Sequence, residues 1–212
     1  DVYLLAPSSF TFGARDVIAE DVEGGSDTVF STSSTSLEDF ANVEHLTLLG
    51  SDDINGTGNT GSNRITGNAG DNILHGGFGG LDTLRGGAGD DTYYQTSGVT
   101  IVEAANAGID TLISAMTASL SANVDVLRLT GSAAINGTGN SIANRITGNS
   151  GANVLNGGTG DDTLQGLAGA DTLIGGSGND TFYLTATSTV IEAAGAGTDT
   201  GLSATSAILA AN

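Results

Sequence analysis

Apolar residues recur along much of this chain at a fixed spacing, each at the centre of a short β-favouring stretch. In residues 139–183 a six-residue segment rich in Gly, Asn and Asp alternates without a break with three residues such as RIT, TLQ or TFY. Residues 58–94 repeat the pattern, with one unit a residue longer. Because side chains alternate across a strand, each short stretch predicts one inward-facing residue. The expected core residues are Ile65, Leu74, Leu84, Tyr93, Ile146, Leu155, Leu164, Leu173 and Phe182.

The nine-residue period predicts how these short strands assemble. Two units form a coil of about 18 residues that carries two short parallel strands on opposite walls, and stacked coils lie about 4.8 Å apart, the usual strand spacing. Repeats of this length cannot bury an apolar face alone, so neighbours must stack. The predicted fold class is all-β, a parallel β-roll or β-helix solenoid.

A longer repeat encloses the two arrays. The string INGTGN at 54–59 returns at 135–140, and IVEAANAGIDTL at 101–112 resembles VIEAAGAGTDTG at 190–201. We therefore expect one continuous solenoid that is a piece of a longer array. Its predicted segments are 1–57 (partial unit and spacer strands), 58–94 (first nonapeptide array), 95–138 (spacer solenoid segment), 139–183 (second array) and 184–212 (start of a truncated third unit).

Composition and charge restrict the partners of such a fold. The chain has 24 carboxylates against five arginines, a formal net charge of -19, and no cysteine. This balance repels nucleic acid phosphates, and no apolar run of about 18 residues is present to insert into a membrane. Ordering the glycine-rich turns costs roughly 1–2 kcal/mol per residue, whereas one buried Leu returns only about 1.5–3 kcal/mol. The thin core therefore needs another source of stability.

An acidic or amide residue occupies the sixth position of the regular units, and stacking would align these residues in rows. Aligned carboxylates repel one another, so a cation between them is expected. Ca²⁺ accepts six to eight hard oxygen ligands in flexible geometry, whereas Zn²⁺ prefers His or Cys and Mg²⁺ demands a tight octahedron. The sequence therefore predicts several bound calcium ions.

Units such as GGTGDDTLQ (157–165) and GGSGNDTFY (175–183) resemble the RTX, or haemolysin-type, calcium-binding nonapeptide G-G-x-G-x-D-x-U-x. In that family an ion lies between one turn and the turn two units later. The resemblance implies that the earlier turn offers the carbonyls of its second and fourth residues and its aspartate. The later turn would offer the carbonyls of its first and third residues and its aspartate. The best-matching site consists of Gly158, Gly160, Asp162, Gly175, Ser177 and Asp180.

The same resemblance implies four further sites. Two have aspartates 19 residues apart: Gly176, Gly178 and Asp180 with Ala194, Ala196 and Asp199, and Gly87, Gly89 and Asp91 with Ala105, Ala107 and Asp110. Two weaker sites contain Asn in place of Asp: Asn149, Gly151 and Asn153 with Gly166, Ala168 and Asp171, and Asn68, Gly70 and Asn72 with Gly86, Ala88 and Asp91. Asp82, in the longer unit, is a further metal candidate. At Asn63 and Asn144, amides that hydrogen-bond to neighbouring coils are a metal-free alternative.

Little else in the sequence indicates chemistry. His45 and His75 are the only histidines, no HExxH occurs, and no segment is left over for a separate catalytic domain. Glu103 and Glu192 recur at matching places, where each either extends a calcium site or ends a solvated strand; the second interpretation is favoured. We predict no enzymatic activity for this chain.

The resemblance also implies a function. Similar proteins leave Gram-negative bacteria unfolded by type I secretion and fold on binding Ca²⁺ outside the cell, so we expect a calcium-binding repeat region that is secreted or lies at the cell surface. One alternative is a structural repeat of an adhesin, surface layer or filament, with end-to-end self-association. Another is the non-catalytic repeat region of a secreted protease, lipase or epimerase.

Overall fold

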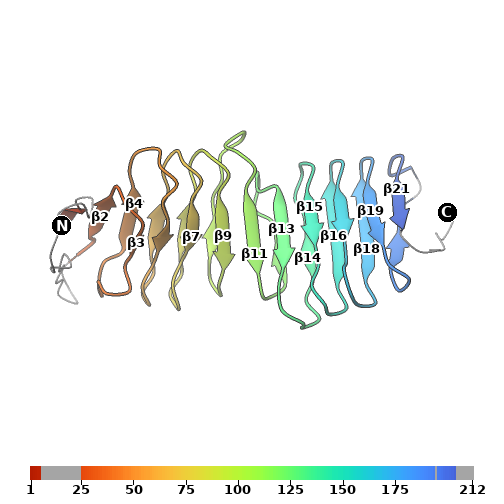
Figure 1. Ribbon diagram of the computed structural model, residues 1–212, viewed down its shortest axis with the longest axis horizontal. Helices are drawn as coiled ribbons and strands as arrows, with labels where there is room; N and C mark the ends of the chain where they lie inside the picture. Colours follow the sequence, from red (N-terminus) through yellow and green to blue (C-terminus); the bar gives the residue numbers. More distant parts are fainter. Residues whose placement is uncertain (6–24, 194, 204–212) are drawn as a thin grey trace. The chain divides into compact units, whose positions relative to one another are not determined.

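The computed structural model describes residues 1–5, 25–193 and 195–203, and within them it contains β-strands and turns but no helix. None of these residues belongs to a helix that is long and apolar enough to cross a membrane. The chain divides into two compact units, Asp1–Asp110 and Thr111–Asn212. In each unit, short strands stack side by side and turns join them (Figure 1).

Two sheets of parallel strands form the first unit. The strands of one sheet, in spatial order, are β1 (Val2–Leu5), β2 (Thr28–Ser31), β4 (His45–Leu48), β6 (Arg64–Thr66), β8 (Thr83–Arg85) and β10 (Thr100–Ile101). The strands on the other wall are β9 (Thr92–Gln95), β7 (Ile73–His75), β5 (Gly56–Thr57) and β3 (Thr35–Ser36). From β2 onward, successive strands along the chain therefore alternate between the two sheets.

The second unit repeats this arrangement. One row of strands consists of β11 (Thr111–Ser114), β13 (Val126–Leu129), β15 (Arg145–Thr147), β17 (Thr163–Gln165), β19 (Thr181–Leu184) and β21 (Thr200–Ser203). The other consists of β12 (Ala118–Ser119), β14 (Gly137–Thr138), β16 (Val154–Thr159), β18 (Thr172–Ser177) and β20 (Thr189–Ile191). The paired strands described in both rows are parallel, so the predicted parallel β-solenoid is confirmed within each unit.

The strand register follows the predicted coil length. Ile146 pairs with Leu164, which pairs with Phe182, so equivalent residues of neighbouring coils are 18 positions apart. In the first unit Ile65 pairs with Leu84, 19 positions later, because the intervening segment contains the one longer repeat. That register keeps every central residue of a strand on the same, inward face.

Each strand of the nonapeptide arrays buries one apolar side chain, whereas the spacer strands β2, β4, β11 and β13 bury two residues each. All nine residues predicted for the core are buried, with relative exposures of 0 or 1%. The two walls pack closely together, and in two strands glycine takes the place of the inward-facing apolar residue. A Cβ on Gly56 would lie 2.9 Å from Ile65 of the opposite sheet, and one on Gly137 would lie 2.8 Å from Leu127. The core is therefore thin and has no room for larger side chains at those points.

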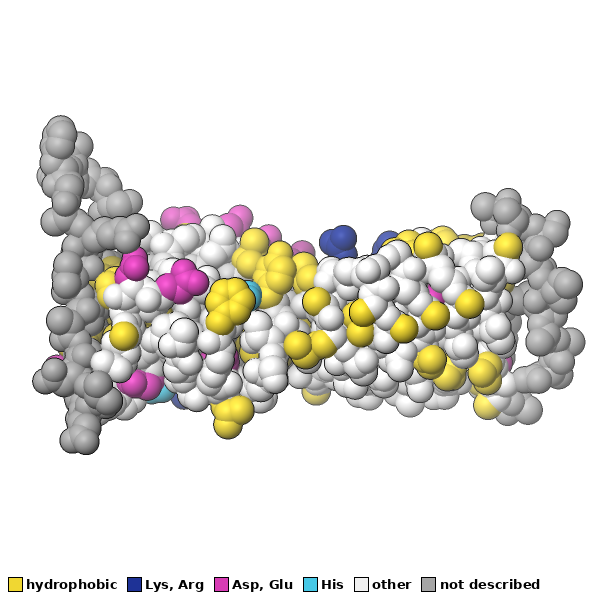
Figure 2. Space-filling view, turned by 90° about the horizontal axis from the view of Figure 1, so that it is seen from below, with side chains coloured by type: hydrophobic (Ala, Val, Ile, Leu, Met, Phe, Trp, Pro, Cys, Tyr) yellow, Lys and Arg dark blue, Asp and Glu magenta, His cyan; other side chains and the backbone are white. Residues whose placement is uncertain are grey.

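Residues on either side of the central position face outward. Ile73, Val154 and Tyr183 are 45, 40 and 43% exposed. Figure 2 shows hydrophobic side chains of this kind in rows across the visible surface. At the start of the third unit, β21 pairs with β19, although every residue in β21 is exposed.

Candidate metal centre

The sixth-position aspartates are buried between coils and form a ladder. The backbone amide of Asn144 donates to Asp162 Oδ1 at 2.7 Å, the amide of Asp162 donates to Asp180 Oδ1 at 2.8 Å, and the amide of Asp180 donates to Asp199 Oδ1 at 2.9 Å. One carboxylate oxygen of each aspartate thus ties two neighbouring coils together. The same contact joins Asn63 to Asp82, Asn72 to Asp91, Asp91 to Asp110 and Asn153 to Asp171.

The second oxygen of these carboxylates is the most informative atom in the turns. It is buried and has no hydrogen-bond partner in Asp82, Asp91, Asp162, Asp171 and Asp180. A buried polar atom without a partner costs about 1–3 kcal/mol, and more when it is charged. Rows of such oxygens in the described residues indicate that these turns are built for a ligand that the carboxylates can hold.

These oxygens point to the first glycine of their own unit. The space that a Cβ of Gly157 would fill is taken by Asp162 Oδ2, and the carbonyl oxygen of Gly175, from the next coil, lies 2.5 Å from the same point. Asp171 Oδ2 lies in the same way against Gly166. Carboxylate and carbonyl oxygens therefore converge where glycine leaves room, and hard oxygens of this kind are the donors that Ca²⁺ accepts.

Burial and crowding make bare carboxylates unfavourable here. Burial raises the pKa of Asp162 to about 7, and the charge of Asp180 adds to the rise. Burial likewise raises the pKa of Asp91 to about 7, with further contributions from Asp110 and Glu103. Burial also raises the pKa of Asp82, Asp171, Asp180 and Glu192. At neutral pH these groups favour a proton or a cation beside them.

The predicted carbonyl donors lie between the turns that the sequence paired. The carbonyl oxygens of Gly158 and Gly160 take up the space that a Cβ of Gly176 and of Gly178 in the next coil would fill. The amide of Gly160 donates to the Ser177 carbonyl at 2.8 Å. The predicted pairs with a 19-residue spacing meet in the same way: Gly89 donates to Ala107 at 2.9 Å and Gly178 to Ala196 at 2.7 Å.

Other residues whose carbonyls were predicted as calcium ligands do not show this contact between paired turns. Ala105 and Ala168 are exposed at the outer side of their turns. Gly87 lies against the Asn68 carbonyl of the preceding coil, and the Ala88 amide donates to that same carbonyl at 3.3 Å. Ala194 lies outside the described residues.

Turns with Asn at the sixth position are arranged differently. Asn153 Oδ1 accepts the Asn149 amide at 2.9 Å, and its Nδ2 donates to the Ile135 carbonyl at 2.6 Å. Asn149 Oδ1 accepts the Gly151 amide, and its Nδ2 donates to two carbonyls of the preceding coil. Hydrogen bonds thus occupy the side-chain oxygens that a metal would need. The turns of Asn63, Asn72 and Asn144 have the same pattern.

Two groups of three carboxylates stand out. In the first unit, one oxygen each of Asp91, Glu103 and Asp110 lies within 4.8 Å of the others, and all three residues are buried. The equivalent oxygens of Asp180, Glu192 and Asp199 in the second unit lie within the same distance of one another, although there only Asp180 is buried, Glu192 is half-buried and Asp199 is exposed. The aspartates were predicted as ligands, whereas the glutamates were favoured as solvated strand ends. The sequence feature that could have identified these glutamates as site residues is their recurrence at matching places in the two EAA segments.

Neither histidine forms a catalytic arrangement with described residues. His45 Nε2 lies 2.9 Å from the Ser26 hydroxyl, but its Nδ1 has no partner to orient the ring. His75 Nδ1 accepts the Gly77 amide, and its ring lies beside Phe78 and Tyr94, with centroid distances of 5.6 and 6.0 Å.

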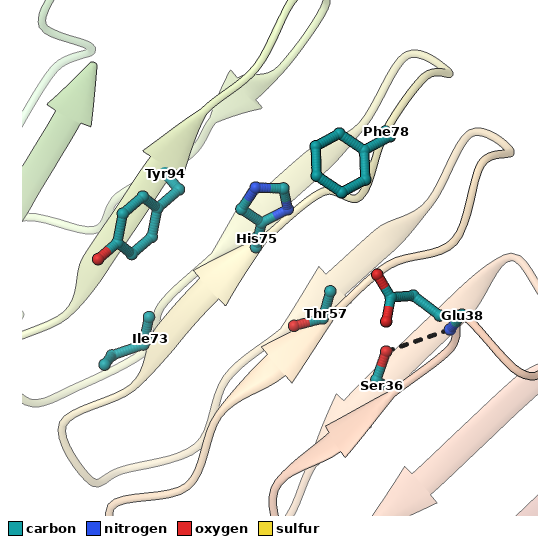
Figure 3. A pocket seen from close by; sticks show the side chains of 7 residues that line it. All are labelled: Ser36, Glu38, Thr57, Ile73, His75, Phe78 and Tyr94. Atoms are coloured by element: carbon teal, nitrogen blue, oxygen red, sulfur yellow. Dashed lines mark hydrogen bonds between the residues drawn. The ribbon is translucent and has the colours of Figure 1, made fainter. Parts of the chain in front are cut away.

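The rings around His75 line an open depression of about 510 Å³, together with residues that include Glu38 and Ser36 (Figure 3). The hydrogen bond drawn there joins the Ser36 hydroxyl to the backbone amide of Glu38, so the Glu38 carboxylate takes no part in it. In this depression the rings belong to exposed strand and turn positions, and no nucleophile with an activating base is present among the lining residues.

Comparison with known proteins agrees with the geometry of the turns. A family model described as the RTX calcium-binding nonapeptide repeat matches four segments, residues 49–80, 79–94, 138–164 and 147–182. These segments contain the sixth-position residues from Asn63 to Asp91 and from Asn144 to Asp180. No curated protein sequence matches the chain.

Proposed function

Because this chain carries RTX calcium-binding nonapeptide repeats, we propose that it is the calcium-binding repeat region of a secreted bacterial protein and that it folds on binding Ca²⁺ outside the cell. The observation that supports this proposal best is the row of buried aspartate oxygens without hydrogen-bond partners. A repeat and a solenoid of this kind are structural and non-catalytic in themselves, so the proposed role is binding and folding.

The residues of the best-matching site fit calcium. Asp162 and Asp180 each present one buried oxygen without a partner, and the Gly175 carbonyl reaches the same space as Asp162 Oδ2. Bound Ca²⁺ supplies positive charge and six to eight coordination positions at about 2.3–2.6 Å. The chain has no Cys, and its two histidines lie in the first unit, so Zn²⁺ lacks its preferred donors here. Carboxylate and backbone carbonyl oxygens from two turns suit Ca²⁺ better than Mg²⁺, which usually keeps several waters.

We assign calcium to turns with aspartate at the sixth position and a metal-free role to those with Asn. Asn149 Oδ1 accepts the Gly151 amide and Asn153 Nδ2, Asn153 Oδ1 accepts the Asn149 amide, and both side chains donate to the preceding coil. In the folded chain they tie neighbouring coils together without a metal ion. Asp162 and Asp180 tie them together with one oxygen and reserve the other for the ion.

Calcium dependence of folding follows from the thin core. The chain carries a net charge of -19, and each strand of the nonapeptide arrays buries a single apolar side chain. Without cations, folding must bury carboxylates whose charged form is disfavoured, and the small apolar surface does not offset this cost. Ligand binding stabilises only the folded state, by RT ln(1 + [L]/Kd) for each site.

The proposed location rests on calcium availability. Extracellular calcium modules bind at about 10⁻⁴–10⁻³ M, and sites of that affinity stay unfilled at cytosolic concentrations. A chain with such sites would remain unfolded inside the cell and become ordered after export. Type I secretion of an unfolded chain from a Gram-negative bacterium is consistent with this order of events.

The proposal is tested by far-UV circular dichroism of the full chain during a calcium titration at neutral pH. We expect a coil-to-strand transition with Ca²⁺ and none with Mg²⁺. The Asp162→Asn variant should need more calcium, whereas Asp52→Asn, the same change at an exposed aspartate whose side chain makes no hydrogen bond to a described residue, should behave as wild type. A chain that is fully ordered in chelator at neutral pH would falsify the proposal.

One observation favours an additional structural role. Within the described residues β21 is the outermost strand of its sheet, and all four of its residues are exposed. An open strand edge can pair with a strand of another chain. We propose that like repeats associate end to end, as a stalk or filament would require. Size-exclusion chromatography with and without calcium tests this: a monomer at every concentration in calcium argues against it.

A further inference from the structure

The two groups of three carboxylates occupy equivalent places in the repeat. Asp91 and Asp180 are the last sixth-position residues of their arrays, and Asp110 and Asp199 follow 19 residues later. Between them, Glu103 and Glu192 precede the second aspartate by seven residues in both units. The glutamates lie outside the segments that match the nonapeptide repeat, which end at residues 94 and 182.

Buried aspartate oxygens point into these groups. Asp91 is 0% and Asp180 is 1% exposed, and the Oδ2 atom of each has no hydrogen-bond partner. At Gly175, the space that a Cβ would fill receives both Asp180 Oδ2 and Glu192 Oε1. The aspartate oxygen and the glutamate oxygen therefore face the same point from different coils.

The first unit repeats this geometry with one more hydrogen bond. Asp91 Oδ2 and the Tyr93 hydroxyl both lie where a Cβ of Gly86 would be. That hydroxyl donates to Glu103 Oε1, and the Gly86 amide donates to the same oxygen at 3.1 Å. In the second unit Phe182 replaces Tyr93, and the Gly175 amide, at 2.7 Å, holds Glu192 Oε1.

We propose that Glu103 and Glu192 are calcium ligands that close each array with a three-carboxylate site, formed with Asp91 and Asp110 in the first unit and with Asp180 and Asp199 in the second. This inference rests on the proposed calcium-binding function and adds a ligand that the nonapeptide does not contain. The oxygens lie within 4.8 Å of one another, and two oxygens bound to one Ca²⁺ at about 2.6 Å can be up to about 5.2 Å apart.

The additional carboxylate should make these sites the tightest in each unit. The site between Asp162 and Asp180 has two carboxylates, and calcium affinity rises with the number of charged ligands. The charged groups that act on Asp91 are Asp110, Glu103 and Asp71, all carboxylates, so a cation there relieves repulsion on every side. Filling these sites first would also fasten the spacer segment to the array.

The test is calcium titration of the full chain by calorimetry and far-UV circular dichroism, with Glu103→Gln and Glu192→Gln against Glu38→Gln. Glu38 is exposed, and its carboxylate makes no hydrogen bond among the described residues, so Glu38→Gln is a matched control for the change in charge. We expect each ligand variant to weaken the tightest binding phase about tenfold and to reach the wild-type spectrum at excess calcium. Glu103→Asp, which keeps the charge, should restore part of the affinity.

The outcomes separate this inference from the proposed function. If wild type binds calcium and Glu103→Gln and Glu192→Gln bind as tightly as Glu38→Gln, the glutamates are not ligands. If a glutamine variant keeps the wild-type midpoint but stays below the wild-type spectrum at all calcium concentrations, the glutamate is a structural residue, which also overturns the inference. If wild type itself binds no calcium, the proposed function fails as well.

Discussion

Stacking of the coils can be tested by adding a single methyl group to one turn. Gly158 has a φ of 104°, and a Cβ there would lie 2.6 Å from the carbonyl oxygen of Asn140 in the preceding coil. An ordinary contact begins at 3.4 Å, so the methyl group of Gly158→Ala is about 0.8 Å too close. Asn140 cannot yield easily, because its side chain donates to the carbonyls of Ser121 and Val124.

A matched control variant measures the cost of placing alanine at a positive φ separately from the cost of the steric contact. Gly131 also has a positive φ, 79°, but nothing lies within 4 Å of its Cβ position. Alanine in the left-handed region costs about 1–2 kcal/mol, and this cost applies to both Gly131→Ala and Gly158→Ala. Overpacking adds about 1–3 kcal/mol at Gly158 alone. The expected losses in the free energy of unfolding are therefore about 1–2 kcal/mol for Gly131→Ala and about 2–5 kcal/mol for Gly158→Ala.

Urea unfolding at saturating calcium, followed by far-UV circular dichroism, measures both losses from the midpoint and the slope of the transition. The difference of about 1–3 kcal/mol corresponds to an unfolding constant about 5- to 150-fold larger for Gly158→Ala. Equal losses of unfolding free energy in the two variants would refute the close approach of Gly158 to the coil that contains Asn140. They would also refute the placement of the Gly158 carbonyl between neighbouring coils.

Other perturbations test the core, the ladder and the charges. Leu164→Ala removes a fully buried side chain and should cost about 2–5 kcal/mol in urea unfolding at saturating calcium; a loss below 1 kcal/mol would contradict the packed core. Asp180→Asn should raise the calcium midpoint more than Asp171→Asn, because Asp180 belongs to two proposed sites; equal shifts in a calcium titration would oppose this. In the metal-free fold the pKa values of Asp91 and Asp162 rise from 3.8 to about 7, so the fold binds protons that the unfolded chain releases. In chelator, strand content measured by circular dichroism should therefore be highest near pH 4 and fall as the pH rises through 7; no change across this range would refute it.

Much of the fold could be predicted from the sequence because one short period recurs throughout. All nine central residues predicted for the core are buried, and Ile146, Leu164 and Phe182 pair in the expected 18-residue register. In a solenoid each unit contacts only its neighbours, so the period of the apolar residues defines both the coil and the stacking. The extra residue of the longer repeat remains in its turn, and Asp82 still accepts the amide of Asn63.

The hydrogen bonding of the sixth-position side chains depends on side-chain geometry, which the spacing of the repeats does not specify. Asp and Asn at the sixth position look interchangeable as oxygen donors, yet Asp162 keeps a buried oxygen without a partner whereas Asn153 satisfies its own. The difference lies in the amide group: Asn153 Nδ2 donates to the Ile135 carbonyl of the preceding coil and to Asn149 Oδ1, whereas a carboxylate has no donor with which to do the same.

The sequence by itself therefore determined the coil, its inward residues and the turns in which carboxylates gather, since all of these follow from spacing along the chain. Only the tertiary structure decided which oxygens remain without partners and that Glu103 and Glu192 join aspartates from neighbouring coils. Glu103 reaches Asp91 because Tyr93 and the Gly86 amide orient its carboxylate across the gap between coils. Such convergence depends on side-chain direction between stacked segments, which residue spacing alone does not specify.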